Sequence, residues 1–463
     1  VERTINALCA ENQRFYQHGF LEVELEMQKS NLLKNAEKAF NERNTKRSER
    51  ILQEYQRHFL PPYSPYLDAE YQLELYKHLL EQITLEEVNT FAKGMVTDEN
   101  AVIIVVAPEK EDVKLPTEDE VLNIYNQANQ KEVEPYVYEV PDEPLISSLP
   151  KKGKVSKREK HKDLDYEVWI LKNGIKVFVK NTDFQDDEIL FEAKSFGGFS
   201  VYDDQDDVSS RIAASVARES GLGNFNRVEL QRKLTGNTVN INPYIGETSE
   251  GLRGSSSVKD FEVLLQLIHL SFTQPRITQT AFNSYINKEK GMLDNASRDP
   301  RSAWQDTISV VGGNYNYRNR PITADLLDEA DFRRVRSIFN QRFGDPTNFD
   351  FYFVGSIENS KTTRKLIEQY IGSLPVVERN EDFRDLGMNP PAGVVEKTVK
   401  KGTDNQCMVM YNIHGDIEYN TQNKLLLNAV SSILSTKLLE KIREKESGVY
   451  TIGAYPRVNR YPN

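Results

Sequence analysis

Two long stretches of the sequence share one order of patterns, and this internal repeat constrains the fold more than any single motif. The first begins with a helical run at Phe20–Asn44, and the second begins with one at Ile277. Each continues through a helical connection to an "IT" dipeptide, another helix and an apolar strand. The closing strands are predicted at Ala101–Val106, of the buried type, and at Phe349–Val354. Two copies of one α+β unit are the economical interpretation, and a chance likeness between helix–strand units is the alternative.

The last helix of the first copy has its own start and stop signals. Thr84 can cap it, and Glu87 follows three residues later, as in a capping box. The polar run Asp98–Asn100 is predicted to end this helix before the strand begins.

Length and charge exclude some classes of protein. A chain of 463 residues is long enough for two to four domains. The net charge of −11 argues against nucleic acid as a partner, because phosphate binding needs a basic surface. No apolar run approaches the roughly 18 to 20 residues that span a bilayer. Cys9 and Cys407 lie too far apart in sequence for a CxxC pair and are predicted to be isolated core thiols.

A connecting region separates the two copies. It is acidic and contains several prolines up to Glu143, and then becomes basic at Lys151–Lys162. The basic run is predicted to be a solvated connector, with an electrostatic latch or an anion site as the alternative.

Strand patterns follow the connecting region. An Asn-Gly pair at residues 173–174 predicts a β-hairpin, and residues 188–196 predict a third strand that ends at a glycine pair. A small-residue helix comes next, followed by a second helix and two alternating strands between residues 228 and 257. A further strand–helix unit is predicted to open at "NQCMVMYNIHG", residues 405–415.

The residues offer no complete catalytic apparatus. The six histidines form none of the H-x-x-H, H-E-x-x-H or H-x-x-E-H patterns, whereas a zinc site normally needs three or four protein ligands. His269 lies in an apolar helical run and is predicted to be a hydrogen-bonded core histidine, and His58 and His78 are predicted to lie on helix surfaces. A phosphate-binding loop and a G-x-S-x-G elbow are also absent.

One stretch near the C-terminus contains two candidate binding residues. In "LLEKIREKESGVYTIGAYPRV" a charged helix is predicted to stop at Ser447-Gly448 and to turn into a strand. Arg443 and Tyr450 then lie on either side of the turn and can point to one side of a sheet edge. A guanidinium and a phenol placed so could hydrogen-bond a peptide carbonyl or the oxyanion formed from it. The structural alternative is an exposed helical Arg beside a half-buried strand Tyr.

Several segments resemble the pitrilysin/insulinase zinc peptidases, particularly their large bacterial periplasmic branch. "GFLEVELEMQKSNLL" resembles the helix after a G-F-T-x-x-E-L turn, and "ITLEEVNTFAKGMVTDENAVIIVVAPE" resembles the end of the second family domain. "LKNGIKVFVKNTDFQDDEILFEAKSFGG" resembles the opening of the third domain, which "FTQPRITQTAFNSY" and "YIGSLP" also fit. "IREKESGVY" corresponds to L-R-E-K-x-G-x-x-Y. The segments occur in the family's order across nearly the whole chain.

The resemblance implies an α+β fold of repeated pitrilysin-type domains, each a mainly antiparallel sheet packed against helices. In this family two halves close like a clamshell around an extended peptide, and the zinc site lies on an H-x-x-E-H helix of the first domain. Arg443 and Tyr450 match the Arg and Tyr that contact substrate and transition state near the zinc. The stretch matching the zinc helix, Ile212–Val216, offers no ligand, and Glu289, near the position of the family's distant Glu ligand, is expected to be a surface residue.

The resemblance also divides the chain. Residues 1–108 are expected to be the C-terminal part of a second peptidase-like domain, and residues 109–163 a linker. Residues 164–377 are expected to form a third, degenerate domain, and residues 378–463 a truncated fourth domain. The chain is then expected to be an excised or processed fragment without the zinc-binding first domain.

The expected function is that of a fragment of a zinc metalloendopeptidase, periplasmic by its branch and otherwise cytoplasmic. Zinc belongs to the parent protein, and this chain alone is expected to hold no metal and to cleave no peptide. The expected partners are a peptide or small unfolded protein substrate and the missing N-terminal catalytic domain, with a homo-oligomer left open. One alternative is a non-catalytic peptidase-like subunit that binds peptide or a catalytic partner, and another is a structural assembly subunit.

Overall fold

The computed structural model describes residues 2–61, 65–95, 102–106, 115–136, 143–357, 361–377, 381–403 and 405–460. The first six helices are α1 (Glu2–His18), α2 (Glu22–Asn41), α3 (Ser48–Phe59), α4 (Ala69–Gln82), α5 (Leu85–Met95) and α6 (Glu118–Ala128). The others are α7 (Asp207–Ser220), α8 (Arg227–Lys233), α9 (Phe261–Thr273), α10 (Gln279–Ala296), α11 (Pro300–Gly312), α12 (Phe332–Phe343), α13 (Lys361–Tyr370) and α14 (Thr421–Leu438). The strands are β1 (Val155–His161), β2 (Tyr166–Leu171), β3 (Lys176–Asn181), β4 (Ile189–Phe196), β5 (Val239–Ile245), β6 (Ser249–Ser256) and β7 (Asp350–Gly355).

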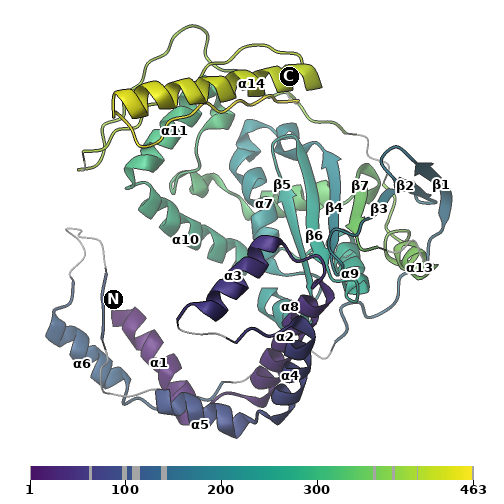
Figure 1. Cartoon of the computed structure of the whole chain (residues 1–463), viewed down its shortest axis with the longest axis vertical. Coiled ribbons are helices and arrows are strands. Elements are labelled where there is room, and N and C mark those ends of the chain that lie inside the picture. Colours follow the sequence, from purple (N-terminus) through teal and green to yellow (C-terminus); the bar gives the residue numbers. More distant parts are fainter. Residues whose placement is uncertain are drawn as a thin grey trace.

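The strands form one sheet in the order β1-β2-β3-β7-β4-β6-β5. Neighbours run antiparallel except β3 and β7, which run parallel. Figure 1 shows this sheet between the N-terminal helices and α14, which lies at the opposite end of the molecule. The expected α+β fold is therefore confirmed.

One face of the sheet holds the main hydrophobic core. Side chains alternate along β4, so Phe191 is buried while Glu192 and Lys194 point away from the core. The ring centroid of Phe191 lies 4.9 Å from that of Phe353 on β7, and Phe261 of α9 meets Phe353 edge-on at 5.6 Å. Helices α7, α9, α12 and α13 contribute buried residues to this core, so these helices cover the apolar face.

The predicted hairpin and third strand are confirmed. Strands β2 and β3 pair around residues 172–175, and Gly174 has φ of +87° as a tight hairpin turn requires. Strand β4 ends at Gly197 and Gly198, with φ of +132° and +60°. A Cβ at Gly198 would collide with the carbonyl oxygens of Gly246 and Glu247, so the chain can turn here only with glycine.

Helices are present in both predicted copies, but the closing strand of the first copy is absent from the described residues. Helix α5 starts with the predicted capping box, because Thr84 N donates to Glu87 Oε2 at 2.8 Å and Glu87 N donates to Thr84 Oγ1 at 3.2 Å. The predicted break at Asp98–Asn100 lies outside the described residues. Residues 102–106 are exposed and form no strand, so that prediction is wrong. Strand β7 pairs with β3 and β4, whereas residues 102–106 pair with no strand in the described ranges.

The connecting region contains regular structure that the sequence did not predict. The basic run forms β1, the edge strand beside β2, rather than a solvated connector, and Arg158 on β1 pairs with Glu167 on β2 at 2.5 Å. Helix α6 packs against α1 through a small cluster that includes Val121 and Cys9. The prediction of a core thiol is therefore confirmed for Cys9, while Cys407 is exposed.

Residues 405–413 form no strand, so the prediction of a strand there is also wrong. Their apolar side chains are exposed, Tyr411 and Ile413 among the most exposed. An isolated apolar segment needs a neighbouring strand to become part of a sheet, and none lies beside it in the described part of the chain. Among the helices of the described ranges, none combines the length and the apolar character needed to cross a membrane.

Candidate functional site

Arg443 lies in a widened helical turn. Helix α14 continues directly into a π-helical turn at Leu439–Lys445, in which backbone bonds span five residues instead of four. The amide of Glu446 donates to the carbonyl of Lys441 at 3.1 Å, which continues this pattern. Short π-helical turns occur frequently at functional sites, so this feature supports the interest of the segment.

The turn after the helix is set by Ser447. Its φ is +51°, in the left-handed region, and its amide donates to the carbonyl of Arg443 at 3.2 Å. The amide of Gly448 then donates to the carbonyl of Ile442 at 3.0 Å. The predicted stop at Ser447-Gly448 is confirmed, with the left-handed residue at the serine.

Both predicted site residues are open to solvent. The side chain of Arg443 is 52% exposed, and its Nε lies 3.7 Å from Oε1 of the neighbouring Glu444. Tyr450 is 98% exposed, so its phenol is available to a ligand. The strand predicted after the turn is wrong, because residues 449–460 form none. Arg443 and Tyr450 therefore flank a helix cap rather than a sheet edge.

The segment after Tyr450 is instead fastened to α14. Ser431 Oγ donates to the carbonyl of Ala454 at 2.6 Å, and the amide of Ala454 donates to Ser435 Oγ at 2.8 Å. The two serines lie one helical turn apart and so face the same side of α14. Sequence reasoning missed them, although two serines four residues apart on an apolar helix were the available signal.

The histidines lie where the sequence predicted. His269 is buried, and its Nδ1 lies 2.9 Å from the carbonyl oxygen of Tyr370. Burial lowers the pKa of His269, which favours the neutral ring, and the hydrogen bond to Tyr370 partly offsets this. His58 and His78 are exposed on α3 and α4. All three predictions are confirmed.

The residues that the structure describes do not fit a zinc ion. The sequence has no H-x-x-E-H motif, and no group of three His, Cys, Asp or Glu side chains in the described ranges has a geometry for holding a metal. The Ile212–Val216 stretch of α7 is largely buried in the core. Glu289 on α10 is half-buried, and its charge adds to the effect of burial in raising the pKa of Tyr285.

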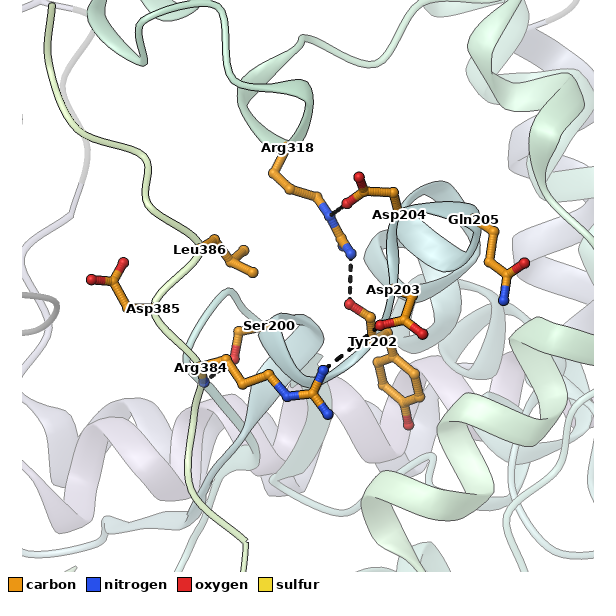
Figure 2. A pocket seen from close by; sticks show the side chains of 9 residues that line it. All are labelled: Ser200, Tyr202, Asp203, Asp204, Gln205, Arg318, Arg384, Asp385 and Leu386. Atoms are coloured by element: carbon orange, nitrogen blue, oxygen red, sulfur yellow. Dashed lines mark hydrogen bonds and ion pairs between the residues drawn. The ribbon is translucent and has the colours of Figure 1, made fainter.

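A polar cavity of about 610 Å³ lies elsewhere in the chain (Figure 2). It is formed by the turn after β4, the loop after α11 and the segment that follows residue 381. Its lining residues are Ser200, Tyr202, Asp203, Asp204, Gln205, Arg318, Arg384, Asp385 and Leu386. The segment is fastened across the cavity because Arg384 N donates to Ser200 Oγ at 2.9 Å and Asn316 Nδ2 donates to the carbonyl of Leu386 at 3.1 Å.

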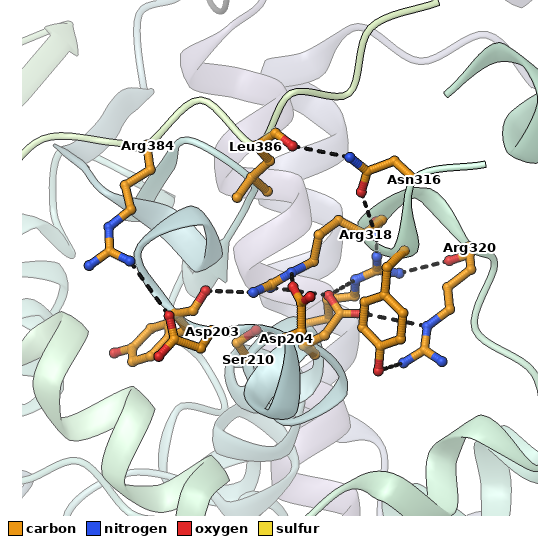
Figure 3. Close-up of polar contacts among 12 residues, drawn as sticks. Asp203, Asp204, Ser210, Asn316, Arg318, Arg320, Arg384 and Leu386 are labelled. Carbon is orange, nitrogen blue, oxygen red and sulfur yellow. Dashed lines mark hydrogen bonds and ion pairs between the residues drawn. The ribbon is translucent and has the colours of Figure 1, made fainter. Parts of the chain in front are cut away.

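The charges beside this cavity bind one another (Figure 3). Asp207 at the start of α7 is fully buried and accepts a hydrogen bond from Arg211 Nε at 3.0 Å. Its Oδ1 lies 3.5 Å from Arg318 Nη1, and its Oδ2 lies 3.9 Å from Arg320 Nε. Arg318, only 5% exposed, also donates to Asp204 Oδ1 at 2.6 Å. The network therefore joins the loop after α11 to α7, and the buried Arg318 is held by internal partners.

Part of the chain matches a known protein family. A family model described as the peptidase M16 inactive domain matches residues 331–462, a range that contains both Arg443 and Tyr450. A zinc protease PQQL-like protein of Arabidopsis thaliana is 24% identical over 450 residues, covering 94% of this chain and 44% of the relative. A probable zinc protease PqqL of Escherichia coli strain K12 is 22% identical over 470 residues, covering 97% of this chain and 48% of the relative.

A solved structure shares the fold. The crystal structure of the periplasmic protease PqqL from Escherichia coli matches with a TM-score of 0.55 and 19% identity, covering 98% of this chain and 50% of that chain. The chain thus spans about half the length of the relatives that it matches. The order of motifs in the sequence, the matched domain and these relatives agree: the chain is similar to M16 peptidases of the pitrilysin type, and its residues 331–462 match their inactive domain.

Proposed function

We propose that this chain supplies the substrate-binding wall of a zinc metalloendopeptidase, with Arg443 and Tyr450 as its contacts to the peptide. The observation that carries the proposal is the pair itself, which lies inside the matched M16 domain and is exposed on both sides of a defined helix cap. The names of the relatives as zinc proteases support the reaction class.

The chemistry of the two side chains suits a peptide backbone. A guanidinium carries several donors in a rigid plane, and a phenol donates one hydrogen bond. Donors aimed at a carbonyl oxygen hold the peptide and stabilise the negative charge that develops when the carbonyl is attacked. The sequence has no H-x-x-E-H motif and the described residues hold no group that fits a metal, so the proposal assigns the metal and the attacking water to a further domain.

The proposed whole protein follows the expected domain division. Residues 1–108 would belong to a second peptidase-like domain, residues 164–377 to a third and residues 378–463 to a fourth, with a first domain that carries the zinc. The proposed substrates are peptides or small unfolded proteins enclosed between the halves. A periplasmic location is proposed on the strength of the Escherichia coli structure.

Peptide binding by the purified chain tests the proposal. The assay is fluorescence anisotropy with a fluorescein-labelled casein fragment. Arg443→Ala should bind about tenfold more weakly, because it loses hydrogen bonds from a charged group, and Tyr450→Phe about threefold more weakly, because it loses one neutral hydrogen bond. Arg457→Ala and Tyr455→Phe are matched controls, because both residues are exposed on the same C-terminal segment. The proposal is wrong if the two pairs of variants bind equally well.

The second candidate is a non-catalytic peptidase-like subunit that binds peptide or a catalytic partner. The description of the matched domain as inactive favours it. The gene sequence that precedes Val1 separates the two, because an H-x-x-E-H motif there selects the enzyme. A purely structural subunit would show no loss of peptide binding in Arg443→Ala.

A further inference from the structure

We propose that Ser447 is a positioning residue, whose left-handed backbone sets the placement of Arg443 relative to Tyr450. The inference deepens the proposed function and rests on it, because it explains how two residues seven positions apart serve one ligand. Ser447 itself need not touch the peptide.

The backbone of Ser447 is unusual for its residue type. Its φ of +51° lies in a region that glycine enters freely, asparagine tolerates and β-branched residues avoid. In this conformation its amide reaches back to the carbonyl of Arg443, at 3.2 Å. The backbone of Ser447 is thus hydrogen-bonded directly to the backbone of Arg443, the proposed substrate contact.

The end of the helix at Ser447 decides where Tyr450 lies relative to Arg443. If the helix continued, seven further residues would carry Tyr450 about 10 Å along the axis, at about 1.5 Å per residue. The left-handed residue instead ends the helix, and the amide of Gly448 closes on the carbonyl of Ile442 at 3.0 Å. The π-helical turn at Leu439–Lys445 widens the last turn, so this closing bond spans six residues.

Gly448 is not the residue on which the turn depends. A Cβ built at Gly448 would lie 3.7 Å from the carbonyl oxygen and 3.8 Å from Cγ2 of Ile442, which are ordinary contacts. Its φ is also not in the left-handed region. Gly448→Ala is therefore a suitable control in the same turn.

The experiment uses the casein-fragment assay and a graded series at position 447. Ser447→Gly and Ser447→Asn should bind within about twofold of the wild type, because both residues accept the left-handed region. Ser447→Ala should bind more weakly than either, and Ser447→Val should bind about threefold to tenfold more weakly than the wild type. Gly448→Ala should bind like the wild type.

Two further readouts separate positioning from general loss of structure. In a double-mutant cycle, Arg443→Ala and Tyr450→Phe should be coupled in the wild-type background and additive in the Ser447→Val background. Hydrogen exchange of the Gly448 amide should speed up in Ser447→Val, while the amides of β4 and β7 stay protected.

The outcomes distinguish this inference from the proposed function. If Arg443→Ala and Tyr450→Phe bind like the wild type, the proposed function is overturned and the positioning role with it. Only the positioning role is overturned if those two variants bind weakly while Ser447→Val binds normally. The same holds if the two mutations remain coupled in the Ser447→Val background. The positioning role is also overturned if Ser447→Gly binds the peptide as weakly as Ser447→Val.

Discussion

Removal of the buried carboxylate of Asp207 should destabilise the chain more than any loss of a surface charge beside it. Asp207 is fully buried, and its Oδ1 accepts a hydrogen bond from Arg211 Nε at 3.0 Å and lies 3.5 Å from Arg318 Nη1. The variant Asp207→Ala leaves these arginines with one fewer anion in a largely buried region. Breaking a buried ion pair by removing one partner costs about 3 to 5 kcal/mol.

We expect the loss of stability to lie at the lower end of that range, because both arginines keep other hydrogen bonds. Arg318 keeps its hydrogen bond to Asp204, and Arg211 keeps bonds to the carbonyls of Arg318 and Arg320. One hydrogen bond to a charged group is worth about 1.5 to 3 kcal/mol. We therefore expect the free energy of unfolding to fall by about 3 kcal/mol in Asp207→Ala.

Urea unfolding followed by tryptophan fluorescence measures this loss, because Trp169 is fully buried in β2. A loss of about 3 kcal/mol lowers the urea midpoint by about 1 to 2 M. The matched control is Asp203→Ala, which removes a 79% exposed carboxylate that lies 3.7 Å from Arg384. An exposed pair contributes about 0 to 1 kcal/mol. Equal midpoints for the two variants would refute the reasoning.

Three further predictions follow from the core, a turn and the thiols. Burial lowers the pKa of His269, so the imidazole is protonated in the unfolded chain before it is protonated in the folded chain as the pH falls below about 6.5. The free energy of unfolding of the wild type, measured in urea, should therefore decrease below this pH. The variant His269→Gln should lose this part of the pH dependence. Gly198→Ala should lower the melting temperature far more than Gly174→Ala, because both have positive φ but only Gly198 faces a collision with carbonyl oxygens; equal shifts would contradict this. Cys407 should react with Ellman's reagent in the native chain while Cys9 reacts only on unfolding, since burial protects the Cys9 thiol and raises its pKa.

Features encoded within a few residues were predictable from the sequence. The Asn173-Gly174 turn and the Thr84–Glu87 capping box both appear where local chemistry requires them. The same holds for the strands β4 and β7, whose alternating or apolar patterns find neighbours in the sheet. His269 was predictable because an imidazole within an apolar helix must be buried with a partner.

Features that depend on distant partners were not predictable. Residues 102–106 and 405–413 have apolar, strand-forming sequences, yet a strand exists only where another strand supplies hydrogen bonds, and none does so here in the described ranges. The network of Asp207 joins α7 to arginines more than a hundred positions later. The acidic run at residues 203–207 was visible, but nothing in its spacing identified Arg318 as a partner.

The candidate site shows how a local rule and the backbone can differ within one turn. A glycine after a charged helix usually takes the left-handed position at the helix end, and that rule favours Gly448. The structure places the left-handed residue at Ser447, and Gly448 follows with ordinary space around its α-carbon. Because the helix first widens into a π-turn, the closing bond from Gly448 reaches back six residues to Ile442 rather than the usual five. A rule based on glycine would therefore predict that residue 448 tolerates substitution poorly and residue 447 well, whereas the backbone predicts the reverse.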